Sequence, residues 1–260
     1  MNILALETAT DNCSVALSVS GDIRVKTEFA PRKQAQLLLP MVDAILAEAG
    51  IARTQLDTLV FGQGPGSFTG LRVAAAASQG IAMALDLPVV GVSTLAAIAH
   101  QQFRRQGEQL CLACLDARMS EVYWGLYHST LEGHSQVLSG DALCTPDSVS
   151  IPADLASQGR VFSSGDTGSI KLSIAGSGAH LLNALNVPAD WQTSAHDGVL
   201  PDAQDVLLLG VPRIEAGDML PADQALPVYL RNKVAETESE RRVRRAETEN
   251  EAESRRGERS

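Results

Sequence analysis

A glycine-rich turn between residues 62 and 70 is the part of this chain best suited to hold an anion. Its sequence is Gly62-Gln-Gly-Pro-Gly-Ser-Phe-Thr-Gly70, between a short apolar run at 58–61 and an alanine-rich segment at 73–85. A strand, a glycine turn and a helix in this order point backbone N–H groups at an anion or at a partner's loop. The turn lacks the Lys of a Walker loop and the third glycine of a dinucleotide-binding turn. We therefore predict a turn that does not itself catalyse phosphate chemistry.

A single acidic residue, Glu7, stands at the end of the first predicted strand. Sugar kinases, actin and heat-shock ATPases place Asp and Gly in a similar hairpin to hold metal and phosphate. Here the acid is one carbon longer, and Ala9 stands where a glycine would let a phosphate approach. The residues of this candidate phosphate loop are Glu7, Thr8, Thr10, Gly64, Gly66 and Ser67. They form either a vestigial loop or, alternatively, the site of an ATPase or kinase that uses Glu7 and the Gly64–Gly70 turn.

Other patterns that carry chemistry are absent from the sequence. Cys111 and Cys114 match C-x-x-C, but positions i and i+3 of a strand face opposite sides, which favours two core cysteines. The five histidines include no H-x-x-x-H pair, so we predict no metal site, against the alternative of a metalloprotease. No serine lies in a G-x-S-x-G elbow. We therefore predict no catalytic residue.

Composition indicates a cytoplasmic protein. The chain has 260 residues, 45% of them hydrophobic and only 4% aromatic, and a formal net charge of −10. An acidic surface argues against tight binding of nucleic acid by this chain alone. The sequence has no apolar run long enough for a bilayer, no signal peptide at its start and no cysteine framework typical of secreted domains.

Periodicity predicts two similar α/β lobes. Strands are expected at 3–10, 14–19, 23–29, 58–61, 87–92, 110–116 and 121–128, helices at 34–49, 69–86, 95–105 and 202–216, loops at 157–180 and an extended piece at 227–232. Gly50 should end the helix at 34–49, and Pro40 should kink it or delay its start. We divide the chain into a first lobe at 1–105, a second lobe at 106–234 and a charged, disordered tail at 235–260.

Two features allow either a structural or an interaction role. The helices at 34–49 and 69–86 carry a wide apolar stripe and many alanines, which suit burial within the lobe or contact with another protein. Asp116 and Arg118, followed by Tyr123 and Trp124 on a face taken to be exposed, indicate a turn salt bridge or a partner-contact edge. Arginines at 241–245 could touch RNA, although flanking glutamates favour a solvated tail.

Six sequence blocks resemble the TsaB family, also called YeaZ. They are Ile3–Leu17, Leu39–Met41, Gly62–Arg72, Gly91–Leu95, Asp116–Trp124 and Pro227–Asn232. The resemblance runs in order from residue 1 to about 234 and implies a two-lobed, actin-like and ribonuclease-H-like (ASKHA) α/β fold, with mixed sheets flanked by helices. The Ser/Gly-rich region at 157–172 and the tail after Val234 depart from the pattern.

The resemblance implies a non-catalytic subunit of the bacterial machinery that makes threonylcarbamoyladenosine beside the anticodon of tRNAs reading A-starting codons. Its expected partners are TsaD, which transfers the threonylcarbamoyl group, and the ATPase TsaE, with tRNA reached only through the complex and no membrane contact. The family pairs through its first two helices, which maps partner binding onto Gln36, Leu39, Met41, Val42, Ile45, Thr69, Arg72, Val73 and Ala76. A homodimer through the same surface is the alternative when the chain is alone. No cofactor is expected, with ATP or ADP at the partner interface left open.

Overall fold

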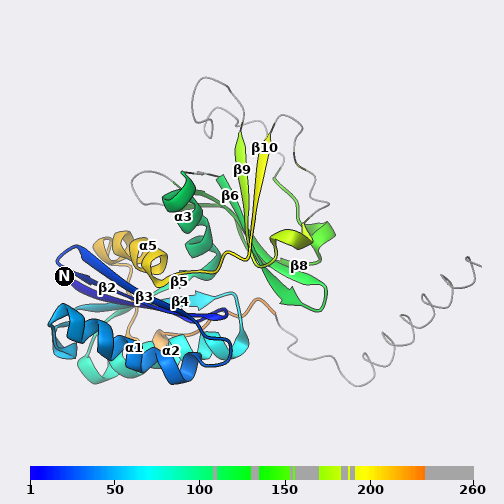
Figure 1. Cartoon of the computed structure of the whole chain (residues 1–260). Coiled ribbons are helices and arrows are strands. Elements are labelled where there is room, and N and C mark those ends of the chain that lie inside the picture. Colours follow the sequence, from blue (N-terminus) through cyan, green and yellow to red (C-terminus); the bar gives the residue numbers. More distant parts are fainter. Residues whose placement is uncertain are drawn as a thin grey trace, which may run out of the picture. The chain divides into compact units, whose positions relative to one another are not determined.

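The first sheet joins five strands in the order β3-β2-β1-β4-β5 in the computed structural model (Figure 1). They are β1 (Asn2–Glu7), β2 (Asn12–Val19), β3 (Asp22–Phe29), β4 (Thr58–Gly64) and β5 (Val89–Ser93). The strands β1, β2 and β3 form an antiparallel meander, and β4 and β5 run parallel to β1. Parallel neighbours require crossover connections, which the helices α1 (Gln34–Ala49) and α2 (Phe68–Leu85) provide.

The structure describes residues 1–107, 110–129, 135–152, 155, 170–182, 187 and 191–231. Residues Met1–Leu230 form one compact unit, and the description below concerns this unit. The division into lobes at 105 and 234 stays a prediction. The tail at 235–260, with the arginines at 241–245, lies outside the described residues, as do His134 and most of the Ser/Gly-rich region at 157–172.

The second sheet repeats the strand order of the first. Its strands are β6 (Leu110–Arg118), β7 (Glu121–Ser129), β8 (Ser135–Cys144), β9 (Lys171–Gly176) and β10 (Gln192–Asp197), in the order β10-β9-β6-β7-β8. Again the first three strands form an antiparallel meander and the last two run parallel to the first. The fourth strand of each sheet ends on a glycine with a positive φ, +118° at Gly64 and +120° at Gly176. The repeat confirms a two-lobed, actin-like α/β fold.

Side chains alternate along β1 and divide the first lobe into two apolar layers. The helices α1 and α2 cover one face of the first sheet, and α5 (Ala203–Glu215) covers the other (Figure 1). Leu4 and Leu6 belong to the apolar layer on the α1 and α2 side, whereas Ile3 and Ala5 belong to the layer on the α5 side. The helix α3 (Thr94–Gln106) follows β5 and packs against α5 and against β6 and β7. Short 3-10 turns lie at Arg53–Gln55, Pro146–Ser148, Ala179–Leu181 and Ala222–Gln224. Within the described residues, no helix has the length and apolar character needed to cross a bilayer.

Helix ends follow the residue chemistry of the sequence. Ser67, Ser93 and Asp202 stand at the N-caps of α2, α3 and α5, and each side chain accepts a backbone N–H of the first turn. Gly50 ends α1 in a left-handed conformation with φ of 69°, as predicted. The helix α1 begins at Gln34 and contains Pro40, so the proline does not delay its start.

One expectation for the second lobe was wrong, and two of its strands were missed. Strand β9 lies where only loops were expected, and β8 and β10 were not predicted at all. Each of the three has serine or charged residues among its apolar ones, which weakens the alternation that marks a strand. The two cysteines of the C-x-x-C pattern are buried, with Cys111 packed toward α3 and Cys114 on the opposite face of the sheet, as predicted.

Candidate functional site

The glycine turn packs directly on the first hairpin. The Thr8 hydroxyl donates to the carbonyl of Gly70 at 2.7 Å, and the Ser67 N–H donates to the carbonyl of Ala9 at 2.7 Å. A Cβ at Gly66 would lie 2.5 Å from the Ala9 oxygen, and a Cβ at Gly70 would lie 2.0 Å from the Thr8 oxygen. The space between hairpin and turn, where a phosphate would have to sit, is therefore filled by the chain's own backbone.

The other members of the candidate phosphate loop are also held by the chain itself. The carbonyl of Thr10 accepts the side-chain amide of Gln34 at 2.7 Å. Gly64 faces the carbonyl of Val228, which lies 2.8 Å from the position of a Cβ. Ser67 is exposed, and its hydroxyl caps α2 by accepting the N–H of Gly70 at 3.4 Å. Thr8, Gly66 and Ser67 therefore form a closed turn with Ala9 and Gly70, whereas Thr10 and Gly64 contact Gln34 and Val228.

Glu7 points inward rather than toward solvent. Its side chain is fully buried, and one carboxyl oxygen accepts the N–H of Ala9. The other oxygen, Oε2, has no partner among the described residues and lies only 1.8 Å from where Gly62 would carry a Cβ. Burial, with a smaller contribution from the charge of Asp202, raises the pKa of Glu7 to about 7 against the opposing Ala9 hydrogen bond. This carboxyl is therefore a buried group that is protonated below neutral pH.

Substituting Gly70 by alanine tests whether the turn is closed. Gly70→Ala should lower the free energy of unfolding by about 2 kcal/mol, because the new Cβ would overlap the Thr8 carbonyl. Gly80→Ala is the matched control within α2, since a Cβ there meets no atom within 4 Å, and it should stabilise by about 0.5–1 kcal/mol. Urea unfolding of the two variants measures both values. Equal effects would show that the turn stands free of the hairpin.

The predicted partner-binding residues divide into a surface set and a core set. On α2, Thr69, Arg72 and Ala76 are exposed. Val73 is half-buried against the apolar layer that contains Leu4 and Leu6. On α1, Gln36 and Leu39 are exposed. The remaining three, Met41, Val42 and Ile45, are buried between α1 and the sheet. The structure does not place these three side chains on a contact surface, because they lie on the inward side of α1. They can support the exposed residues of the helix by packing beneath them.

Residues far along the chain extend this surface in a way the sequence did not reveal. The Arg72 guanidinium lies 3.6 Å from the centre of the Phe68 ring, and its Nε donates to the Tyr229 hydroxyl at 2.9 Å. The Gln79 amide donates to the carbonyl of Asp223 at 3.1 Å. The segment at 222–230 therefore runs beside α2. The exposed apolar side chains of this region are Leu39, Phe68, Met83, Leu226, Val228 and Tyr229.

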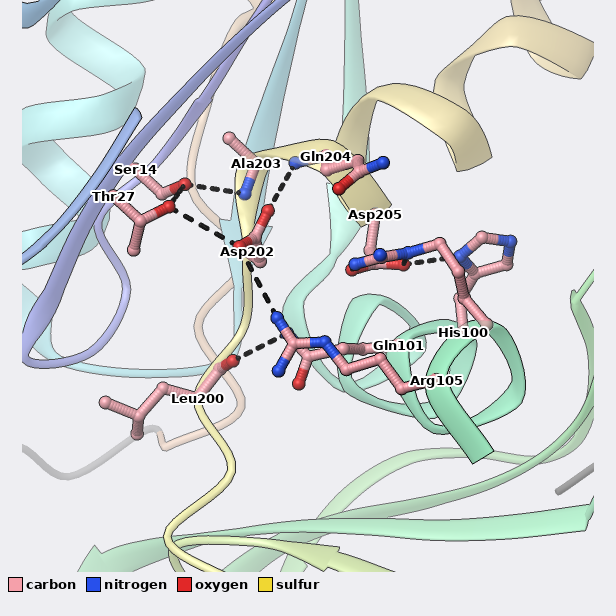
Figure 2. Close-up of polar contacts among 11 residues, drawn as sticks. Ser14, Thr27, His100, Gln101, Arg105, Leu200, Asp202, Ala203, Gln204 and Asp205 are labelled. Carbon is pink, nitrogen blue, oxygen red and sulfur yellow. Dashed lines mark hydrogen bonds and ion pairs between the residues drawn. The ribbon is translucent and has the colours of Figure 1, made fainter. Parts of the chain in front are cut away.

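A polar network fixes the start of α5 to strands β2 and β3 and to α3 (Figure 2). The Ser14 hydroxyl accepts the N–H of Ala203 at 3.0 Å and shares a 2.7 Å hydrogen bond with Thr27. Asp202 accepts the Gln204 N–H at 2.7 Å and the Thr27 hydroxyl at 3.4 Å, and Arg105 lies 4.0 Å away. No spacing in the sequence indicated this network, since its members come from four separate elements.

The fully buried carboxylate of Asp205 joins α3 to α5. Asp205 bonds to His100 Nδ1 at 2.7 Å and to Arg104 Nε and Nη2 at 3.0 and 2.7 Å. The forked contact with Arg104 is the bidentate geometry that guanidinium and carboxylate favour. Among the described residues, no three His, Cys, Asp or Glu side chains gather in a way that could hold a metal ion.

The turn between β6 and β7 contains a local ion pair. Arg118 Nη1 lies 3.0 Å from Asp116 Oδ2, and the Arg118 N–H donates to Asp116 Oδ1 at 2.7 Å. Trp124, expected on an exposed face, is buried in the core of the second lobe, and Tyr123 is half-buried. The geometry supports the turn salt bridge, and the burial of Trp124 removes one of the two aromatic anchors expected for a contact edge.

Comparison with known proteins gives consistent matches. A family model described as "TsaD: tRNA N6-adenosine threonylcarbamoyltransferase" matches residues 25–252. The tRNA threonylcarbamoyladenosine biosynthesis protein TsaB of Escherichia coli is 35% identical over 235 residues, which cover 90% of this chain and 96% of that protein. The solved structure of YeaZ from Pseudomonas aeruginosa is 38% identical with a TM-score of 0.78, covering 88% of this chain and 99% of that one.

Proposed function

The chain belongs to the TsaB (YeaZ) family of tRNA threonylcarbamoyladenosine biosynthesis proteins, and from this premise we propose that it is a non-catalytic subunit. It pairs with TsaD and, together with TsaE, supports transfer of the threonylcarbamoyl group to the adenosine beside the anticodon. The tRNAs concerned read codons that begin with A, and the chain reaches them only through the complex, in the cytoplasm. Its own contribution is to bind and orient TsaD.

The closed turn between Gly66 and Gly70 is the observation that carries the non-catalytic role. A phosphate held by this turn would need open space between the hairpin and the turn, and here the Thr8 and Ala9 carbonyls lie against the turn. Glu7 is buried and faces β4, so it offers no carboxylate to a bound metal–phosphate group. These contacts weigh against the alternative of an ATPase or kinase that uses Glu7 and the Gly64–Gly70 turn. No nucleotide is assigned to the chain by itself.

The outward side of α2 supports the pairing role. Thr69, Ala76 and Gly80 are exposed and lie on one side of the helix at spacings of seven and four. Such small side chains let a partner helix approach closely, as at other tight helix contacts. Leu39 and Met83, which are 49% and 65% exposed, place large apolar groups nearby. This surface can also pair with a second copy of the chain, so we propose a homodimer as the form without TsaD.

An arginine at the centre of this surface tests the proposal. Ala76→Arg should weaken binding to TsaD by about 100-fold, because a buried, unpaired charge costs about 3 kcal/mol at a packed interface. Size-exclusion chromatography with light scattering, with and without Mg-ATP, measures the heterodimer. Ala216→Arg is the matched control, since it replaces an exposed alanine after α5, beyond the opposite face of the sheet. Equal binding by wild type and Ala76→Arg would exclude this surface, and no binding by the wild type would overturn the proposed role.

A further inference from the structure

A cavity beside Gln63, the second residue of the glycine turn, has no place in the proposed function. It has a volume of about 500 Å³ and lies between the end of β5, the start of α3, the second half of α5 and strand β8. This volume is in the range of sites that hold small organic ligands. Val92, Ala96, Leu209 and Pro212 form apolar parts of its wall, and the polar groups of the cavity gather at two places.

The first polar group is Asp141, which an irregularity in β8 turns inward. Trp124 pairs with Ala142 and Leu126 pairs with Ser139, so two residues of β8 stand opposite the single Gly125. Such a β-bulge re-aims side chains. A Cβ at Gly125 would lie 2.9 Å from both Asp141 Oδ1 and the Tyr127 ring. The bulge and the glycine together make room for the carboxylate at this point.

Two hydroxyl groups hold the Asp141 carboxylate in place. The Ser93 hydroxyl donates to Oδ2 at 2.6 Å, and the Tyr127 hydroxyl donates to Oδ1. None of the ion pairs found among the described residues involves Asp141. Burial raises the pKa of this carboxyl above its usual value, while the two hydroxyl donors oppose the rise. This half-buried carboxylate at the cavity wall therefore has no ion-pair partner in the part of the chain that the structure describes.

The second polar place is formed by Gln63 and Arg213. A Cβ at Gly91 would lie 2.1 Å from Gln63 Oε1, so the missing side chain at Gly91 gives the Gln63 amide its position. Arg213 donates from Nη1 to the Gly91 carbonyl and from Nε to Asp218 at 2.7 Å. A guanidinium has five N–H donors, so these two bonds leave donors for a further acceptor.

We propose that this cavity binds a small organic molecule through a cationic nitrogen held by Asp141. The ammonium group of the ligand donates to the Asp141 carboxylate and supplies the positive charge opposite it. The apolar wall of Val92, Ala96 and Leu209 covers the rest of the ligand. Simple amines and amino acids share this ammonium. An amino acid also carries a carboxylate that Arg213, in the same cavity, can bind, whereas a simple amine has no such group. None of the cavity-lining residues belongs to the surface proposed for pairing with TsaD.

The test uses three sets of matched probes on the full chain: the twenty amino acids, the amines that lack their carboxylate and the acids that lack their amino group. Saturation-transfer NMR identifies binders, and calorimetry measures them. We expect at least one amino acid or amine to bind with a Kd below about 1 mM, and its deaminated counterpart to bind at least tenfold more weakly. Amines that bind as well as their amino acids would show that Arg213 takes no part.

Substitutions separate a ligand site from a purely structural hydrogen-bond network. Asp141→Asn should reduce affinity for the amine at least tenfold, and the exposed Asp147→Asn should leave it unchanged. Ala96→Leu fills part of the cavity and keeps the carboxylate, so it should also abolish binding. This variant provides the test if Asp141→Asn fails to fold. The proposal is overturned if no probe with an ammonium group binds more tightly than its deaminated counterpart. It is equally overturned if Asp141→Asn or Ala96→Leu binds as the wild type does.

Discussion

Replacing Asp205 by alanine should lower the free energy of unfolding by about 3–5 kcal/mol, because it leaves buried partners without their carboxylate. Asp205 is fully buried and forms a hydrogen bond with His100 (Figure 2). It also accepts two hydrogen bonds from Arg104. The side chain of Arg104 is about one quarter exposed, so part of its charge can regain water, which places the expected loss toward the lower end of this range. The effect should be independent of any partner protein.

Urea unfolding followed by far-UV circular dichroism measures this loss. Asp43→Ala is the control, since Asp43 pairs with Arg53 between exposed side chains, and its removal should cost less than about 1 kcal/mol. The double variant Asp205→Ala/Arg104→Ala should be less destabilised than the sum of the two single variants, because it removes both charges together. A loss for Asp205→Ala as small as that for Asp43→Ala would show that the buried carboxylate is not the group that joins α3 to α5.

The first lobe could be predicted closely from sequence because its signals are local. The helix at 34–49 has the predicted bounds, and the serine and aspartate caps stand where their residue types place them. Strand β9 was missed because it is short and its burial is set by β6 and β10 on either side, which no local pattern records. The three core residues of α1 were misassigned for a related reason: a wide apolar stripe does not say which part faces the sheet.

The Asp141 cavity and the glycine turn show why the geometry of the candidate sites was harder to predict than the fold. Asp141 reaches Ser93 and Tyr127 only because a bulge in β8 turns it inward, and bulges have no dependable sequence signature. The glycines gave a usable signal: Gly66 and Gly70 indicated close backbone approach, but the approaching group is the chain's own hairpin rather than a phosphate. A glycine in the sequence can indicate that another group lies close to the backbone, but it does not indicate which group that is.

Glu7→Gln should gain stability relative to the wild type as pH rises from 4.5 to about 7. The carboxyl of Glu7 has a pKa of about 7 in the folded chain and 4.5 as its ordinary value, because burial disfavours the charged form. Between these values the unfolded chain has lost the proton that the folded chain keeps. Stability of the wild type therefore falls as pH rises from 4.5 to 7, by about 3 kcal/mol in total, and this contribution stays constant above 7.

The difference in free energy of unfolding between Glu7→Gln and the wild type, measured by urea unfolding from pH 4 to 8, isolates this contribution. Other titrating groups affect both proteins alike, and any constant effect of the new amide cancels in the pH dependence. The exposed Glu215→Gln, at the end of α5, is the matched control and should stay within about 0.5 kcal/mol of the wild type. A difference for Glu7→Gln that does not change with pH would mean that water reaches the carboxyl. The hairpin would then be open, and the alternative of a nucleotide site at Glu7 would regain its physical basis.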